Sequence, residues 1–400
     1  MTTSTWRCAL VSMMCVLLGA CSETPPTGSI DADASTPGAR EDAGPDAAAL
    51  DEGEPDAGDE RDAGDERDAS GVRDGGGGAE CGPFDFAPVD AALEALVDEG
   101  AAPGIAFSIV RPGCGVLHEV AVGTFDVDTV QPIASASKVP SMTLLMTLVD
   151  EGLVSLDAPV RTYLGDAWAG DRAAITVRQL MSHRSGLPGN ARCLGDADTT
   201  LEACAASIAA APLAAEPGDF LYGGSSYQVA GRIAEVVTGE RWNELFASRI
   251  GIPCGLERFS YAASSGNPLG SDTNPRVAGG AASDVRDYGR LLLLHLEGGM
   301  CGATRVLSEA SVAEMQRDQT VGATIEGSPY DDGRSYGLGW WLEPADGPTE
   351  VWSDAGAFGT KPWIDPGRRY GAVVLIRRST AVGERIYDAV RPLVEAALAR

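Results

Sequence analysis

Apolar residues recur with two different periods along the chain, and the change of period predicts where helices and strands lie. Residues 87–100 place apolar side chains at helical spacing and end at a glycine, which predicts an amphipathic helix. Residues 104–110 and 115–123 are two apolar runs separated by a turn with Pro112 and Gly113, the pattern of a β-hairpin. The folded part of the chain is therefore expected to begin with a helix and two paired strands.

The far end of the chain shows the reverse order, with strands before a helix. Residues 351–359, 360–365 and 370–377 predict three more strands, and residues 385–400 predict a C-terminal helix. Between about 135 and 320 the patterns are mostly helical and are separated by loops rich in glycine and proline. We therefore expect an α/β fold of the α+β kind: an antiparallel sheet built from both termini, flanked by helices, with a mostly helical region inserted.

Residues 21–80 form a segment of very different composition from the rest. From residue 22 onward it has almost no large apolar side chain, and its four arginines face eighteen Asp and Glu residues, a net charge of −14. That is half of the formal charge of −28 of the whole chain. Such a segment cannot bury enough surface to offset the entropy of ordering it, so it is predicted to be a disordered acidic linker before a domain at 81–400. The acidity argues against a nucleic-acid partner.

The first twenty residues are typical of an export signal. One arginine precedes an apolar run that is too short for a comfortable membrane span. The run ends in Leu-Gly-Ala-Cys, which resembles a bacterial lipobox and predicts that Cys21 carries the lipid anchor. Because Ser22 rather than an aspartate follows, we expect a cell-envelope lipoprotein, anchored in the outer membrane. The alternative is an ordinary secretory signal that is cleaved nearby.

Six cysteines lie beyond the signal region, an even number that suggests disulfides in an exported protein. Six cysteines allow 15 complete pairings, so the connectivity does not follow from the count. We predict that each cysteine pairs with its neighbour along the chain. The first pair is the best argued, because the helix at 87–100 runs out and the next strand runs back, which returns Cys114 to Cys81. The predicted pairs are Cys81–Cys114, Cys193–Cys204 and Cys254–Cys301. Their wide spacing is unlike that of zinc ligands, and we expect no metal and no cofactor.

Ser135 and Lys138 are the first candidates for chemistry. A spacing of three places them one turn apart at the start of an apolar helix, and Pro140 agrees with a helix that begins here. Burial and the helix dipole both favour an uncharged lysine, which can take the proton of a serine hydroxyl. The alternatives are that Ser135 only caps the helix, or that Ser137 is the nucleophile although it lies off the face of Lys138.

Other serine-hydrolase arrangements have little support. The chain has no G-x-S-x-G elbow and only three histidines. His118 lies in a predicted strand and His295 in an apolar helix, so both are expected to be structural. A serine–lysine pair is therefore the better hypothesis.

The motifs around Ser135 and Lys138 resemble those of a known family. This part of the chain is similar to the serine hydrolases of the class C β-lactamase and D-alanyl-D-alanine carboxypeptidase group, which includes esterases. The similarity extends over about residues 88–400 and implies a β-lactamase/transpeptidase-like fold. It rests on S-x-x-K followed in order by LVDEGLVSLDAPVRTYL (148–164), ITVRQLMSHRSGLPG (175–189), NPRVAGGAASDVRDYGRLL (274–292) and YGLGWW (336–341).

The resemblance implies roles for individual residues. Ser135 would be the acylated nucleophile and Lys138 its base. Tyr222 falls on the tyrosine of the family's Y-x-N motif and would exchange a proton with the serine and the leaving group. The backbone N–H groups of Ser135 and Ala357 would form the oxyanion hole, and His183 would belong to a structural box that supports the site.

Two substrate-binding positions depart from the family pattern. Gly224 stands where the Y-x-N asparagine is expected, so a side-chain amide is missing. Asp354 stands where a lysine or histidine is expected, although Gly356 of the same motif is retained. An ionised Asp354 facing the substrate would repel a free carboxylate, which predicts that neutral esters are preferred over β-lactams and D-Ala-D-Ala peptides.

These features predict a serine hydrolase that acts through an acyl-enzyme on an ester or amide. The substrate would be a small molecule or a peptidoglycan-type peptide. The nearest alternative is a D-Ala-D-Ala carboxypeptidase or a β-lactamase. An alternative of another class is a catalytically silent binding lipoprotein, which the retained Ser135, Lys138 and Tyr222 argue against.

Overall fold

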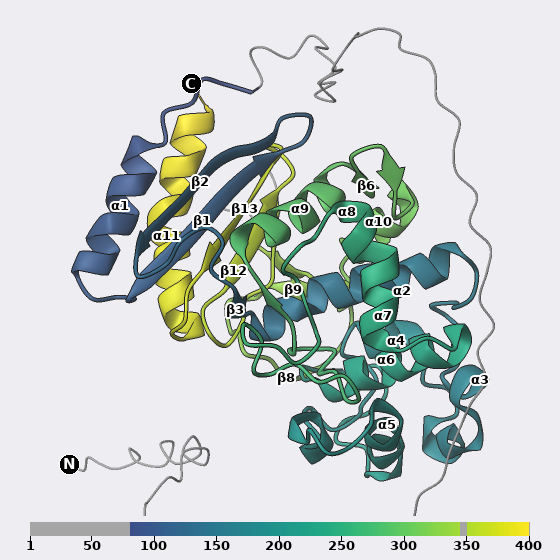
Figure 1. Ribbon diagram of the computed structural model, residues 1–400. Coiled ribbons are helices and arrows are strands. Elements are labelled where there is room, and N and C mark those ends of the chain that lie inside the picture. The colour runs from purple at the N-terminus through teal and green to yellow at the C-terminus, as the bar shows by residue number, and fades with distance from the viewer. Residues whose placement is uncertain (1–80, 345–349, 400) are drawn as a thin grey trace, which may run out of the picture. The chain divides into compact units, whose positions relative to one another are not determined.

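Strands from both ends of the domain form one seven-stranded antiparallel sheet (Figure 1). The computed structural model describes residues 81–344 and 350–399. The strand order is β2-β1-β13-β12-β11-β10-β9. The strands span Gly104–Arg111 (β1), Gly115–Gly123 (β2), Ser335–Tyr336 (β9), Trp341–Glu343 (β10), Val351–Ser353 (β11), Lys361–Asp365 (β12) and Tyr370–Leu375 (β13). The expected sheet from both termini is therefore confirmed, whereas the predicted signal peptide, Cys21 and the acidic linker lie outside the described residues.

The N- and C-terminal parts of the domain meet at the pairing of β1 with β13. Ala106 lies opposite Leu375, and Val110 lies opposite Gly371. Nearly every residue of these two strands is buried, which explains why each reads as a continuous apolar run rather than as an alternating one. Helices cover both faces of the sheet at this point.

One face of the sheet is covered by α1 (Ala87–Asp98) and α11 (Thr380–Leu398), and the other by α9 (Val285–Leu296) (Figure 1). The helix predicted at 87–100 matches α1. The C-terminal helix begins at Thr380, five residues before its predicted start.

The strand predicted at 351–359 is shorter than expected. It ends at Ser353 because the chain then turns back: the Gly356 N–H donates to the Thr360 carbonyl over 2.8 Å, and Gly359 adopts a φ of 92°. A positive φ of this kind favours glycine. Residues 354–360 are therefore a turn at the edge of the sheet rather than a strand.

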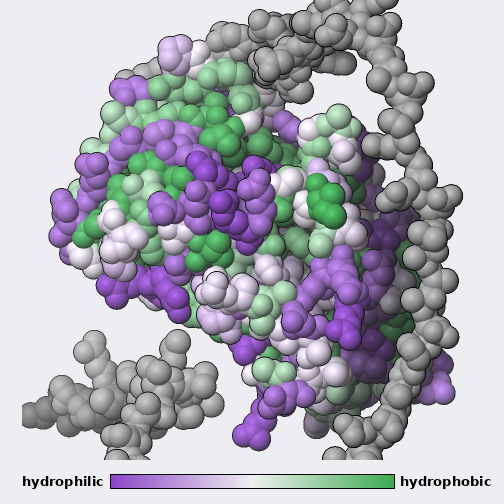
Figure 2. All heavy atoms as spheres, viewed as in Figure 1, coloured by the Kyte–Doolittle hydropathy of each residue, from purple (hydrophilic) through white to green (hydrophobic). Residues whose placement is uncertain are grey.

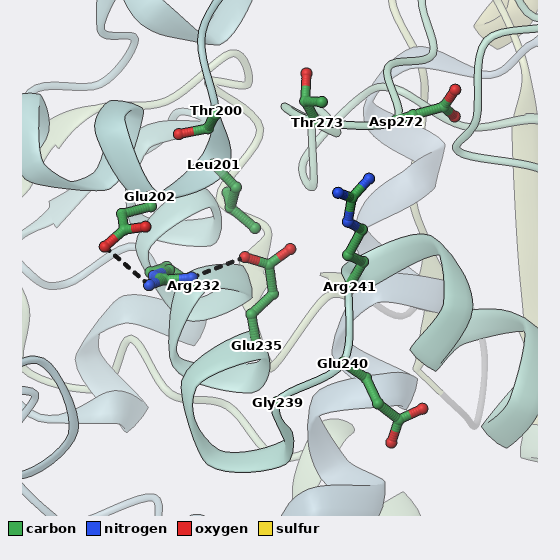
Figure 3. A pocket seen from close by; sticks show the side chains of 10 residues that line it. All are labelled: Thr200, Leu201, Glu202, Arg232, Glu235, Gly239, Glu240, Arg241, Asp272 and Thr273. Atoms are coloured by element: carbon green, nitrogen blue, oxygen red, sulfur yellow. Dashed lines mark hydrogen bonds and ion pairs between the residues drawn. The ribbon is translucent and has the colours of Figure 1, made fainter.

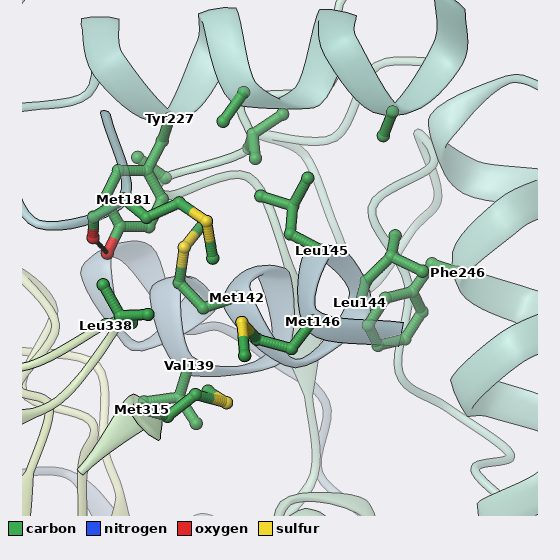
Figure 4. Close-up of a cluster of buried hydrophobic side chains, with 14 of the residues drawn as sticks. Val139, Met142, Leu144, Leu145, Met146, Met181, Tyr227, Phe246, Met315 and Leu338 are labelled. Atoms are coloured by element: carbon green, nitrogen blue, oxygen red, sulfur yellow. Dashed lines mark hydrogen bonds between the residues drawn. The ribbon is translucent and has the colours of Figure 1, made fainter. Parts of the chain in front are cut away.

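The inserted region is mostly helical, as expected, and surrounds the buried helix α2 (Lys138–Asp150). Figure 4 shows α2 side chains, among them Met142 and Met146, packed against Met181, Met315 and Tyr227 from surrounding segments. Eleven of the thirteen residues of α2 are buried, so this helix forms the centre of the inserted region. The other helices are α3 (Arg161–Leu164), α4 (Val177–Met181), α5 (Leu201–Ala210), α6 (Ser225–Thr238), α7 (Trp242–Phe246), α8 (Ile252–Cys254) and α10 (Glu309–Met315).

Three pairs of short strands connect segments of the inserted region. One pair is parallel and joins the chain just before Tyr222 to a later loop. The pairs are β3 (Gln131–Pro132) with β5 (Ala282–Ser283), β4 (Phe220–Leu221) with β8 (Ile325–Gly327), and β6 (Met300–Cys301) with β7 (Thr304–Arg305).

All three predicted disulfides are present. Cys81 joins Cys114, Cys193 joins Cys204, and Cys254 joins Cys301, with Cα–Cα distances of 5.5, 5.3 and 4.9 Å. The bonds join cysteines that are neighbours along the chain, with sequence separations of 33, 11 and 47.

On the face shown in Figure 2, polar and apolar groups are mixed over the surface. Among the described helices, none combines the length and the apolar character needed to cross a membrane.

Candidate active site

Ser135 and Lys138 lie together at the start of α2. Ser135 is on a 3₁₀ turn (Ala134–Ser137) that leads into the helix, and a 3₁₀ turn aligns side chains three residues apart. The Lys138 Nζ donates to Ser135 Oγ over 2.9 Å and to the Ala278 carbonyl over 3.0 Å. Lys138 is 2% exposed, whereas Ser135 is partly accessible. The structure thus holds the nucleophile and base candidates in contact.

Ser137 is a structural residue in this turn. It is fully buried, its Oγ donates to the Ala134 carbonyl over 2.6 Å, and it accepts the Ala281 N–H over 3.0 Å. These bonds hold the backbone of Ala134, which has a φ of 47°, a conformation that costs a non-glycine residue about 1 kcal/mol or more. The alternative that Ser137 is the nucleophile is therefore disfavoured. The helix-cap alternative for Ser135 is also disfavoured, since the residue before α2 is Ser137.

The ring of Tyr222 also lies beside Lys138. Its ring centroid is 4.7 Å from the Lys138 Nζ and 4.6 Å from the His183 ring. His183 is only 1% exposed, and burial, with a smaller contribution from the charge of Lys138, holds its pKa well below the usual value. A neutral His183 packed under Tyr222 fits the supporting role expected from the sequence.

The turn after β11 packs directly on the nucleophile turn. A Cβ atom on Gly356 would lie 2.1 Å from the Ile133 carbonyl oxygen and 3.5 Å from the Ala136 nitrogen, so no larger residue fits without a shift. Ala357 follows at an exposed position. Gly356, the residue before Ala357, thus packs on the turn that carries Ser135, and the assignment of the Ala357 N–H to the oxyanion hole stays a prediction.

Asp354 does not face the substrate side, and the sequence-based expectation for it is wrong in this respect. The side chain is 0% exposed. Burial raises the pKa of its carboxyl well above the usual value, and Lys138 in its charged form would oppose this only in part. Burial of the side chain keeps Asp354 from contacting a substrate carboxylate. The position also supplies no cation.

We expect Asp354→Asn to make stability less dependent on pH. Because the pKa of the Asp354 carboxyl is higher in the folded than in the unfolded protein, its contribution to stability is fully present below about pH 4, where the carboxyl is protonated in both states. This contribution is lost as the pH rises towards the pKa of the folded protein. The wild type should therefore lose about 1.4 kcal/mol of unfolding free energy per pH unit in that range, relative to the variant. Urea unfolding at pH 4, 5 and 6 measures this difference. A constant difference would mean that Asp354 is ionised in the folded protein.

Aromatic rings extend the site beyond Tyr222 in a way that sequence reasoning missed. Trp341 lies 5.3 Å from the Tyr222 ring, and Tyr330 lies 4.9 Å from Trp341. The Arg334 guanidinium stacks on Tyr330 at 3.7 Å, and Arg334 also pairs with Asp332. Tyr330 stands in a polar loop without periodicity, so nothing in the local sequence indicates that it packs near the site.

Two cations at this end of the sheet are matched by carboxylates. Lys361 is fully buried, and its Nζ lies 2.7 Å from Glu343 and 3.2 Å from Glu384. Arg334 lies 3.4 Å from the same Glu343 in addition to its pair with Asp332. Neither cation replaces the lysine or histidine expected at position 354, because each is already compensated.

A charged surface pocket lies at the other end of α6, away from Ser135 (Figure 3). In it, Arg232 bridges Glu202 and Glu235 at 3.1 and 3.2 Å, and the Arg241 side chain projects beside them. Arg232 and Glu235 lie seven and ten residues beyond Ser225, so they are about 10 and 15 Å along the helix from the end that follows Tyr222. None of the predicted site residues lines it.

The sequence that forms this site matches a known protein family. The profile of the Beta-lactamase family matches residues 89–396. The chain belongs to this family of serine hydrolases. Penicillin-binding protein 4 of Amycolatopsis lactamdurans is 33% identical over 298 residues, which cover 66% of this chain and 77% of that protein.

Solved structures agree with the family and the fold. A putative β-lactamase from Bacteroides dorei superposes with a TM-score of 0.69 and 28% identity, over 79% of this chain and 100% of that chain. A family VIII carboxylesterase superposes with a TM-score of 0.64 and 22% identity, over 77% and 97% of the two chains, and shows the fold alone. The β-lactamase/transpeptidase-like fold predicted from the motifs is thus confirmed.

Proposed function

We propose that this β-lactamase family member is an esterase-like hydrolase that forms an acyl-enzyme on Ser135. The observation that carries the proposal is the contact of the Lys138 Nζ with Ser135 Oγ at 2.9 Å, beside the Tyr222 ring. Lys138 is buried while Ser135 is accessible, so the hydroxyl that meets the substrate touches a base sheltered from solvent.

In the proposed reaction, Ser135 Oγ attacks the carbonyl carbon of an ester or amide as Lys138 accepts the hydroxyl proton. The oxygen of the tetrahedral intermediate accepts hydrogen bonds from the Ser135 and Ala357 N–H groups. Tyr222 donates its phenolic proton to the leaving group as the bond between that group and the carbonyl carbon breaks, and Lys138 returns to Tyr222 the proton that it took from Ser135. Water then attacks the acyl carbon of the acyl-enzyme, and one of its protons passes to Ser135 Oγ as the bond between Oγ and the acyl carbon breaks and the acid is released.

Two observations favour neutral esters as substrates. Position 354 offers no cation to a substrate carboxylate, and Arg334 and Lys361 are paired with carboxylates of their own. The partly exposed rings of Tyr222 and Tyr330, which both pack on the buried Trp341, suit an apolar acyl or alcohol group. A second candidate is action on peptidoglycan-type peptides or β-lactams, which is favoured by the 33% identity to a penicillin-binding protein.

We further propose that the enzyme is tethered to the cell envelope through a lipid on Cys21, with the outer membrane as the favoured location. The support is the Leu-Gly-Ala-Cys sequence at the end of the N-terminal apolar run, followed by serine. The acidic segment 21–80 would then hold the hydrolase domain away from the membrane surface. The three disulfides agree with an exported domain.

The proposed acyl-enzyme chemistry is tested by treating the wild type with a fluorophosphonate and mapping the modified peptide. We expect one adduct, on Ser135, and loss of p-nitrophenyl ester hydrolysis in step with labelling. An enzyme that stays unlabelled and does not turn over esters would support the silent binding protein instead.

A further inference from the structure

The loop between α10 and β9, residues 316–334, is bound to the backbone of Tyr222. The Tyr222 N–H donates to the Gly327 carbonyl over 2.9 Å. The Phe220 N–H, two residues earlier, donates to the Thr324 carbonyl over 2.8 Å. These bonds accompany the parallel pairing of β4 with β8. The loop therefore has a fixed position relative to the proton donor of the proposed reaction.

Tyr330, near the end of this loop, is held in addition by charged residues. The Arg334 guanidinium lies 3.7 Å from the centre of the Tyr330 ring, and the Tyr330 Oη donates to Glu384 Oε1 over 3.2 Å. Burial and the nearby Glu384 raise the pKa of the Tyr330 hydroxyl above its usual value, so the hydroxyl stays protonated and can donate. Glu384 is itself paired with the buried Lys361 at 3.2 Å. A ring that is held before the substrate arrives loses little entropy on binding.

The rings of Tyr330 and Tyr222 pack on the same indole. The Trp341 ring centroid is 4.9 Å from that of Tyr330 and 5.3 Å from that of Tyr222. Trp341 is only 1% exposed, whereas both tyrosines are partly exposed. The two tyrosines thus form an aromatic surface over a buried base, which continues from Tyr222 to Tyr330. A flat apolar group can lie on such a surface, because ring contacts bury apolar area and add an attraction of their own.

The proposed reaction determines which part of an ester meets this surface. Tyr222 donates its phenolic proton to the leaving group, so the alcohol oxygen must come within hydrogen-bond reach of the Tyr222 hydroxyl. The carbonyl oxygen lies instead against the N–H groups of the proposed oxyanion hole. The substituent on the alcohol oxygen therefore begins beside Tyr222, at one end of the aromatic surface.

We propose that Tyr330 is a specificity-determining residue on the alcohol side of the site, where its ring packs against the alcohol part of the substrate. The substrate class is an ester of an arylalkyl alcohol, such as a benzyl ester. The charged groups around the ring are paired with one another, Arg334 with Asp332 and Glu384 with Lys361, which favours an uncharged alcohol. The inference rests on the proposed hydrolase function.

The test uses two isomeric esters, benzyl acetate and methyl phenylacetate, which carry the same ring on the alcohol side and on the acyl side. Methyl acetate is the reference without a ring. Benzyl acetate and methyl acetate form the same acetyl-enzyme, so the ratio of their kcat/KM values reports contacts made before the alcohol leaves. In Tyr330→Ala and Tyr330→Leu this ratio should fall about tenfold, the effect of losing one aromatic contact. Tyr330→Phe keeps the ring and should keep the ratio of the wild type.

Tyr163→Ala, on α3, is the matched control. Tyr163 also has a partly buried ring, and its hydroxyl accepts the Ser155 N–H over 2.8 Å. This variant should leave the ratio unchanged. Methyl acetate hydrolysis and fluorophosphonate labelling should persist in every variant, because none of them alters the groups that react.

The outcomes separate this inference from the function it rests on. An unchanged benzyl-to-methyl ratio in Tyr330→Ala or Tyr330→Leu, with methyl acetate still hydrolysed, would overturn the role of Tyr330. An equal fall in Tyr330→Phe would also overturn it, since the hydroxyl rather than the ring would then set the ratio. A fall confined to methyl phenylacetate would overturn the assignment to the alcohol side. A wild type that neither labels nor hydrolyses any of the three esters would overturn the proposed function and this inference together.

Discussion

Replacing Ser135 by alanine is expected to abolish ester hydrolysis and fluorophosphonate labelling while the domain stays folded. The substitution removes only the hydroxyl group, whose oxygen lies 2.9 Å from the Lys138 Nζ. Loss of a nucleophile or of its base typically lowers kcat by several orders of magnitude, because such residues act as a unit. Lys138→Ala and Tyr222→Phe should therefore fall in the same range, measured as kcat with a p-nitrophenyl ester.

Ser137→Ala is the control for this prediction, since it removes a serine hydroxyl two residues away. Ser137 makes two hydrogen bonds within the turn and is fully buried. We expect this variant to lose about 1–3 kcal/mol of stability and to keep covalent labelling on Ser135. Near-normal turnover by Ser135→Ala, or labelling that moves to Ser137, would show that the nucleophile has been assigned wrongly.

The second large effect is in substrate choice: the wild type is expected to prefer a p-nitrophenyl ester to nitrocefin by about a hundredfold or more in kcat/KM. A cation 4–6 Å from a substrate carboxylate attracts it by roughly 3–4 kcal/mol at an effective dielectric constant near 20. Solvent screening reduces this attraction to about 3 kcal/mol, which corresponds to about a hundredfold in kcat/KM. Position 354 does not supply the attraction. Parallel assays with the two substrates measure the ratio.

Asp354→Asn distinguishes the two physical explanations for such a preference. If Asp354 is buried and uncharged, as the structure indicates, the variant should keep the ester-to-nitrocefin ratio of the wild type. An ionised aspartate facing the substrate would instead predict a marked rise in nitrocefin turnover once the charge is removed. Efficient nitrocefin hydrolysis by the wild type itself would contradict the preference for esters.

Local patterns in the sequence were sufficient for much of the architecture and for the contact between Ser135 and Lys138. Apolar runs with periods of two and 3.6 indicated the strands and helices at both ends of the domain, because burial on one sheet or helix face imposes those periods. Ser135 and Lys138 are three residues apart, so their contact follows from the geometry of a single turn. The disulfide partners are near neighbours in sequence, and each pair was predicted correctly.

The environment of Asp354 and the position of Tyr330 depended instead on tertiary packing. Distant segments exclude water around Asp354 and so raise the pKa of its carboxyl, and neither its neighbours in sequence nor the shortened strand before it reveal that burial. Tyr330 is linked to Tyr222 through the ring of Trp341, which lies 4.9 Å from the first and 5.3 Å from the second. Periodicity records only how each residue relates to its own helix or strand. Dielectric environment and hydrogen-bond partners are set by which segments meet when the chain folds.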